Sequence, residues 1–304
     1  MREHLQIKFD DKVNLNGYVW KNENVKPKAI IEISHGMAEH ILRYDEFAEK
    51  LAAEGYIVYG FDHYAHGGSR YEGQGLGVCT DYDFMTAIIK DIKTVREYID
   101  VVNKDGLDVY LFAHSMGSMA AQRYIQLYPH DFKKAIICGT DFAGNKYKLA
   151  KKLLSREIKK HGEISYVPFV ENLGCGAFGK KFKNEGVNAW LTTNPDSVVK
   201  YNADEWCGAQ FPTNYYYSMA NMMTQIAKAN KENNFACRPQ ILLIAGKDDP
   251  VGNFGKGVTK AYKTYDKCGY DAQLILYETA RHELLNEIEG IKNQVIFDVI
   301  SFYN

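Results

Sequence analysis

Short runs of branched and aromatic residues alternate with longer amphipathic stretches over the first 140 residues of the chain. Four runs are nearly continuous in apolar residues: 28–34, 56–61, 107–113 and 134–138. Such runs are typical of strands covered on both faces, as in a parallel sheet. Between them, apolar residues recur at steps of three and four, which predicts helices near 43–54, 81–103 and 116–128. The alternation predicts right-handed βαβ crossovers and a doubly wound, mostly parallel α/β fold.

This alternation stops near residue 142 and resumes after residue 235. The stretch between has no strand-like run and is rich in lysine, asparagine and aromatic residues. Beyond it, the pattern predicts strands and helices in turn at 240–245, 255–267, 272–278 and 285–303. We therefore predict an α/β core formed by residues 1–141 and 236–304, interrupted by a mostly helical cap at 142–235. Two early runs, 4–9 and 15–21, have no helix between them and predict an antiparallel hairpin at a sheet edge.

Composition narrows the class of protein. The 304 residues include 37 basic and 38 acidic residues, so there is no basic excess for binding nucleic acid. No apolar run approaches the ~18 residues of a transmembrane helix, and the N-terminus lacks the apolar region of a secretion signal. The six cysteines are scattered, without a Cys-x-x-Cys pair or a metal-like spacing to histidine. These features predict a cytoplasmic protein with reduced thiols, no metal site and no nucleic-acid partner.

A candidate nucleophile lies where a predicted strand meets a predicted helix. The sequence Ala113-His114-Ser115-Met116-Gly117 places small residues two positions before and two after the serine, as a tight strand-to-helix turn requires. A serine at the start of a helix also faces free backbone N–H groups, which stabilise an oxyanion. Ser115 is therefore the candidate nucleophile, and the alternative is a buried serine in a tight turn.

A serine hydroxyl needs a base, and the base needs an acid to orient it. The strand predicted at 240–245 runs into Asp248 and Asp249, and the last predicted strand is followed by His282. The order Ser115, Asp248 or Asp249, His282 is the order of the triad in α/β-hydrolases. Since ligands bind at the carboxyl ends of strands in open α/β sheets, all three groups belong at one edge.

A fourth loop follows the strand predicted at 28–34 and reads Ser34-His35-Gly36-Met37-Ala38-Glu39-His40. We expect the backbone N–H groups of Met37 and Met116 to form an oxyanion hole beside Ser115. Glu39, His40 and Arg43 are expected to hold this loop by hydrogen bonds.

Several motifs together resemble the monoacylglycerol lipase and lysophospholipase group of α/β-hydrolases, in its bacterial type. They are HGMAEHILRY (35–44), FDHYAHGGS (61–69), AHSMG (113–117), GKDDPVG (246–252) and ARHELLNE (280–287), with a further likeness over 188–208. The resemblance implies the α/β-hydrolase fold with an inserted cap, and a cofactor-free serine hydrolase of esters that carry an acyl chain. By position it implies Ser115 as nucleophile, His282 as base and Met37 with Met116 as oxyanion donors, and it selects Asp249 over Asp248 as the acid. Two departures from the pattern are Ala113 in the turn, where a glycine is usual, and the Tyr64-Ala65 pair.

The cap supplies candidate substrate contacts. Aromatic residues and methionines adapt to flexible apolar ligands, so we expect an acyl pocket that includes Trp190, Trp206, Phe211, Tyr216 and Met222. Seven basic residues crowd one predicted helix of the cap: Lys146, Lys148, Lys151, Lys152, Arg156, Lys159 and Lys160. They form a solvated face or, alternatively, an edge that makes weak contact with an anionic membrane surface.

The sequence thus predicts a hydrolase of monoacylglycerol- or lysophospholipid-type esters that acts through an acyl-enzyme. The alternatives are a general short-chain carboxylesterase, an aminopeptidase-like hydrolase and a non-catalytic binding protein on the same fold. An aminopeptidase would need acidic cap residues to hold a substrate ammonium. A binding protein would have no need of all three triad residues.

Overall fold

The computed structural model describes residues 1–173 and 175–304, and within them eight strands form one sheet in the order β1-β2-β4-β3-β5-β6-β7-β8. The strands are β1 (Arg2–Lys8), β2 (Asn14–Trp20), β3 (Ala29–Ser34), β4 (Tyr56–Phe61), β5 (Val109–His114), β6 (Lys134–Cys138), β7 (Gln240–Gly246) and β8 (Ala272–Tyr277). Strands β3 to β8 are parallel, whereas β2 pairs antiparallel with both β1 and β4. The predicted strands and the edge hairpin are therefore confirmed, with boundaries that differ by a few residues.

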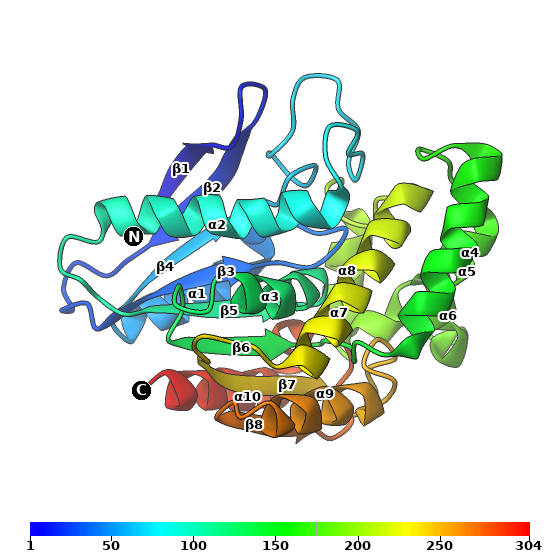
Figure 1. The fold of residues 1–304 in the computed structure, drawn as a ribbon. Coiled ribbons are helices and arrows are strands. Elements are labelled where there is room, and N and C mark those ends of the chain that lie inside the picture. The colour runs from blue at the N-terminus through cyan, green and yellow to red at the C-terminus, as the bar shows by residue number, and fades with distance from the viewer. Residues whose placement is uncertain (174) are drawn as a thin grey trace.

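The apolar runs become strands because the sheet is covered on both faces, and every residue of β3 and β5 is buried. One face packs against α2 (Phe84–Val102), α3 (Met116–Leu127) and α9 (Lys256–Lys267). The other face packs against α1 (Asp45–Ala53) and α10 (Glu289–Tyr303), so the sheet is doubly wound (Figure 1). Short 3₁₀ helices, η1 (Ile41–Tyr44) and η4 (Leu284–Asn286), precede α1 and α10.

The segment between β6 and β7 is helical, and its described part contains no strand. Its elements are α4 (Asn145–His161), α5 (Pro168–Leu173), α6 (Cys175–Phe178), η2 (Gly179–Phe182), η3 (Ala189–Leu191), α7 (Pro195–Ala203) and α8 (Thr213–Glu232). These helices lie together at one end of the sheet (Figure 1). Met222, Met223 and Ile226 of α8 join the main core cluster, so this helix is anchored to the α/β body. The division into a core and a cap at residues 142 and 235 stays a prediction.

No helix in the described ranges combines the length and apolarity that a membrane crossing requires. Five cysteines among the described side chains are unpaired: Cys79, Cys138, Cys207, Cys237 and Cys268. The thiol of Cys175, for which a reduced state was also predicted, lies outside the described side chains.

Candidate active site

Ser115 lies in the turn between β5 and α3 with backbone angles of φ 51° and ψ −118°. A serine in this region is strained, and such strain is concentrated at functional sites. Its N–H donates to the carbonyl of Cys138 at 2.9 Å, which holds the turn against the neighbouring strand. A side chain at Gly117 would lie 2.5 Å from the carbonyl oxygen of Ser34, so only glycine fits there. Ala113, the departure noted above, is fully buried in β5, and the turn forms with its methyl group in place.

The structure brings His282 to Ser115 from the far end of the chain. The imidazole follows β8 and is almost completely buried. Its Nε2 lies 2.8 Å from Ser115 Oγ, and its Nδ1 lies 3.0 Å from Asp249 Oδ2. With a carboxylate at Nδ1, the hydrogen-bond network assigns the proton to that nitrogen and leaves Nε2 to accept from the hydroxyl.

The two adjacent aspartates after β7 have different environments. Asp249 is fully buried, and its second carboxylate oxygen accepts from the N–H of Val251 at 2.8 Å. Asp248 turns outward, where its side chain is 42% exposed and accepts from Lys181 Nζ at 2.9 Å. Of the two candidates for the acid, the structure therefore places Asp249 beside the imidazole.

Carboxylates control the charge of the imidazole. Burial by itself lowers the pKa of His282, but the charge and hydrogen bond of Asp249, with Glu283 and Glu39 further away, hold that pKa above its ordinary value. His114, whose ring centroid lies 4.7 Å from that of His282, is different. Burial, and then the neighbouring basic side chains of His282 and Arg43, lower the pKa of His114 far below its usual range, which keeps it neutral.

The loop of residues 35–40, here called the oxyanion loop, passes very close to the nucleophile. A Cβ at Gly36 would lie 3.1 Å from Ser115 Cβ and 2.6 Å from a carboxylate oxygen of Glu39. Met37, the next residue, and Met116 line the same cavity as Ser115. Two backbone N–H groups directed at the reacting carbonyl would stabilise an oxyanion in acyl transfer, and Met37 and Met116 stay the predicted donors.

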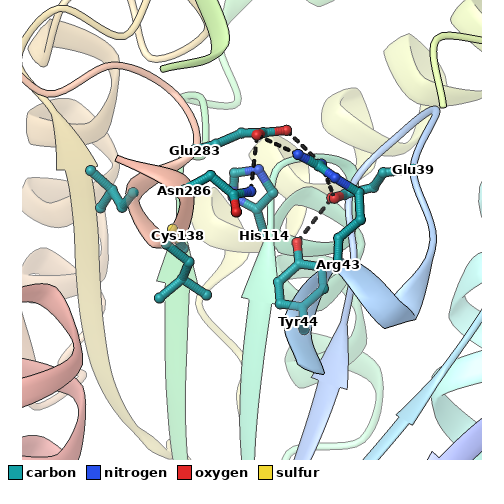
Figure 2. A pocket seen from close by; sticks show the side chains of 9 residues that line it. Glu39, Arg43, Tyr44, His114, Cys138, Glu283 and Asn286 are labelled. Carbon is teal, nitrogen blue, oxygen red and sulfur yellow. Dashed lines mark hydrogen bonds and ion pairs between the residues drawn. The ribbon is translucent and has the colours of Figure 1, made fainter. Parts of the chain in front are cut away.

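Behind the oxyanion loop, a buried guanidinium connects two carboxylates (Figure 2). Arg43 Nη1 donates to Glu39 Oε2 at 2.6 Å and to Glu283 Oε1 at 2.7 Å, and Nη2 donates to Glu283 Oε2 at 2.6 Å. Tyr44 and Asn286 donate to the same two carboxylates at 2.9 and 3.0 Å. The sequence predicts that Glu39 and Arg43 hold the loop, and the structure adds Glu283 as a third member of this cluster. The sequence signal for Glu283 is that a charged residue directly follows the candidate base.

The nucleophile opens into a cavity of about 770 Å³ between the sheet edge and the helices of the 142–235 segment. Most of its wall is apolar, with contributions from α4, α8 and the loops between them. Of the five predicted pocket residues, Trp190, Phe211 and Tyr216 line this cavity. Lining residues that the sequence analysis did not single out include Leu149, Leu153, Tyr166, Val170 and Phe178.

Trp206 and Met222 are not among the described residues that line this cavity, and their role as pocket residues stays a prediction. The indole of Trp206 packs edge-on against the ring of His40, with centroids 5.3 Å apart. Met222 is buried in the main core, whereas Met219, one helical turn earlier on α8, lines the cavity. The composition of a helix shows that it carries methionines, but its rotation about its axis decides which of them faces the ligand.

One group among the described residues has the donor types of a metal site. His40, Asp204 and Cys207 each offer one donor atom, and these atoms lie within 4.8 Å of one another. His40 Nε2 lies 2.8 Å from Asp204 Oδ2, which is a hydrogen-bond distance, and burial raises the pKa of the Cys207 thiol. We interpret this group as a hydrogen bond that ties the oxyanion loop to the segment after α7.

Comparisons with known proteins give matches along most of the chain. The family model described as Hydrolase_4, serine aminopeptidase S33, matches residues 25–289. The chain is 26% identical to monoglyceride lipase of Mus musculus over 93% of this chain and 84% of that protein. It is 24% identical to monoacylglycerol lipase of Mycolicibacterium smegmatis, over 93% and 90% of the two chains. Among solved structures, a thermostable carboxyl esterase of Bacillus coagulans in complex with glycerol superposes with a TM-score of 0.89 at 26% identity, covering 100% of this chain and 98% of the other.

Proposed function

Because the chain belongs to the Hydrolase_4 family and is a serine hydrolase of carboxylic esters, we propose that Ser115, His282 and Asp249 are its catalytic triad. His282, oriented by Asp249, takes the proton of Ser115 as the hydroxyl attacks the ester carbonyl. The N–H groups of Met37 and Met116 stabilise the oxyanion. The alcohol leaves with the proton from His282, and water then hydrolyses the acyl-enzyme by the same steps.

We further propose that the substrate is a monoacylglycerol-type ester. One observation carries this proposal: Ser115 Oγ, hydrogen-bonded to a buried imidazole, faces a largely apolar cavity of about 770 Å³. A volume of this size is typical of sites that enclose most of a small-molecule ligand, and an apolar wall suits an acyl chain. A short-chain esterase would not need so large an apolar space.

The test begins with Ser115→Ala, for which we expect loss of fluorophosphonate labelling and of nearly all ester hydrolysis. Ser218→Ala is the matched control, because Ser218 is a buried serine on α8 that bonds the N–H of Met85. Retained turnover in the Ser115 variant would contradict the triad.

A panel of nitrophenyl esters from acetyl to palmitoyl, followed by monoacylglycerol and lysophosphatidylcholine, then tests the substrate. A sharp optimum at two to four carbons would favour the short-chain esterase instead.

The carboxylates around the cavity favour an ester over an aminopeptide substrate. An aminopeptidase site needs a free carboxylate to hold the substrate ammonium. Among the described cavity residues the carboxylates are those of Glu39, Asp141 and Glu283, and each already has a basic partner: Arg43 for both glutamates and Lys146 for Asp141. Equal turnover of an alanyl nitroanilide and a nitrophenyl ester would reverse this preference.

We also propose a weak contact between α4 and an anionic lipid surface. The outward face of α4 carries Lys148, Lys152, Arg156 and Lys159, and between them Leu149 is 61% exposed beside the cavity. Positive charge attracts anionic lipid, and an exposed apolar residue inserts at the interface. We expect co-sedimentation with phosphatidylserine vesicles that weakens as salt is added.

A triple variant, Lys148→Gln/Lys152→Gln/Arg156→Gln, should lose vesicle binding at low salt. The matched control, Lys256→Gln/Lys260→Gln/Lys263→Gln, removes three exposed lysines on α9 instead and should still bind. Absence of binding by the unmodified protein at low salt would remove the proposal.

Residues 142–235 are also proposed to form a cap over the cavity, and the protein is proposed to be cytoplasmic. Both proposals are supported by the sequence features described above.

A further inference from the structure

One buried guanidinium joins the two loops on which the proposed chemistry depends. Arg43 is 240 positions from Glu283 in the chain, yet its fork donates to both oxygens of that carboxylate at 2.7 and 2.6 Å. The same Nη1 donates to Glu39 at 2.6 Å (Figure 2). Paired N–H···O bonds of this kind fix orientation as well as distance.

Each carboxylate in turn holds one part of the proposed machinery. Glu39 Oε1 accepts the N–H of Gly36 at 2.6 Å, and Gly36 is the residue before the oxyanion donor Met37. Glu283 directly follows His282 in the chain, and its own N–H donates to the carbonyl of Leu191 at 2.7 Å. Arg43 is thus bonded to the oxyanion loop on one side and to the loop of the base on the other.

The three side chains of Arg43, Glu39 and Glu283 stay together because separating these buried charges would be energetically unfavourable. The side chains of Arg43, Glu39 and Glu283 are only 11%, 4% and 6% exposed. Two carboxylates and one guanidinium leave a net charge of −1, and without the guanidinium two carboxylates would face each other away from water. Burial alone would raise the pKa of Glu283, but Arg43 lowers it. Breaking a buried pair by removing one partner is strongly unfavourable, since it leaves an unpaired charge.

We propose that Arg43 is a positioning residue for ester hydrolysis: it sets the oxyanion N–H of Met37 relative to the imidazole of His282. This inference rests on the proposed function of the site. Arg43 acts through Glu39 and Glu283 and takes no part in bond making. Misplacement of reacting groups by about 1 Å costs on the order of 100-fold in rate, so small shifts of either loop matter.

The test compares Arg43→Met with a matched arginine elsewhere. Arg96 on α2 is equally buried, at 12% exposure, and pairs with Asp100 and the carbonyl of Asp131. Active sites are counted by fluorophosphonate titration, and kcat is expressed per titrated site. We expect Arg43→Met to lower kcat per site about 10- to 100-fold with KM within about 2-fold, and Arg96→Met to leave kcat within about 2-fold. Equal kcat per site in the two variants would overturn the proposal.

Arg43→Lys keeps the charge but cannot serve two carboxylates with a fork, so an intermediate loss is expected. It provides the same comparison if Arg43→Met does not fold.

A second readout is the acid limb of the pH profile of kcat/KM. The ionisable groups that face His282 are Asp249 on the loop after β7, Glu283 on its own loop, Glu39 on the oxyanion loop and neutral His114 at the end of β5.

Without Arg43, the carboxylates of Glu39 and Glu283 would face each other away from water, so the pKa of at least one of them rises and it takes up a proton. The acid limb is therefore measured in Glu283→Gln, which keeps Arg43. Since Glu283 helps to raise the pKa of His282, the limb of this variant should move to lower pH. An unmoved limb in Glu283→Gln would show that the cluster does not act on the imidazole and would reject the proposal. Turnover that persists in Ser115→Ala would instead refute the proposed function. An inactive Ser115→Ala with unimpaired Arg43 variants would refute this inference alone.

Discussion

The choice between two adjacent aspartates offers a sharp test of the proposed triad. Asp249→Asn changes one atom type in a fully buried side chain and keeps its shape. The amide oxygen can still accept from the N–H of Val251, so the local fold should persist. The amide N–H₂ would then face Nδ1 of His282 in place of the carboxylate oxygen. Because two donors repel, Nδ1 must become the acceptor, and the proton moves to Nε2.

This tautomer presents an N–H to Ser115 Oγ, so the imidazole can no longer take the serine proton. The lost attraction between carboxylate and developing imidazolium also matters. At the 3.0 Å separation of Nδ1 and Oδ2, and an effective dielectric constant of about 20, it amounts to about 5 kcal/mol. Each tenfold in rate corresponds to about 1.4 kcal/mol, so we expect kcat to fall by about 10⁴, as in other triads that lack the carboxylate.

Asp248→Asn is the matched control. Its side chain is exposed and bonds Lys181 rather than the imidazole, so kcat should stay within about 2-fold of the unmodified enzyme. The assay is hydrolysis of a nitrophenyl ester by both variants, with circular dichroism to show that each is folded. A large loss in Asp248→Asn together with full activity in Asp249→Asn would refute the assignment of the acid.

Three further outcomes are expected. Burial lowers the pKa of His282, but Asp249 raises it by more, so the pKa lies above the ordinary histidine value of about 6.5. Because His282 acts as a base only when neutral, kcat/KM should fall as the pH drops through a midpoint above that value. A midpoint below it in a pH–rate profile would contradict this prediction. Gly36→Ala should cost on the order of 10²–10³ in kcat because its methyl group would push the oxyanion loop away from Ser115, and unimpaired kinetics would show that the loop does not supply an oxyanion donor. Leu153→Trp adds bulk to the cavity wall from α4 and should lower the ratio of palmitoyl to butyryl ester turnover about tenfold; an unchanged ratio would place the acyl chain elsewhere.

The strands, and the chain order of the residues proposed as the triad, could be predicted because they depend on local signals. Strands covered on both faces must be apolar along their whole length, and β4 and β6 begin and end at the predicted residues. The turn around Ser115 requires small neighbours, and loops that follow parallel strands meet at one sheet edge whatever the distance along the chain. For this reason Ser115 and His282 could be named without coordinates.

Other features depend on contacts between segments far apart in the chain. The pairing of Arg43 with Glu283 arises only when η1 and the loop after β8 meet. No pattern within either segment specifies the partner. In the same way, the rotation of α8 about its axis turns Met219 into the cavity and Met222 into the core. Packing against α2, α3 and α4 sets this rotation, and the sequence of one helix does not contain it.

The sequence by itself determined the alternating architecture, the helical segment between β6 and β7, and the three side chains proposed for the chemistry. Periodicity and turn chemistry act over a few residues, so they can be read directly. Only the tertiary structure decided which aromatic residues line the cavity and which carboxylates share one guanidinium. These choices depend on directions and distances of a few ångströms between packed elements, and burial makes each of them energetically decisive.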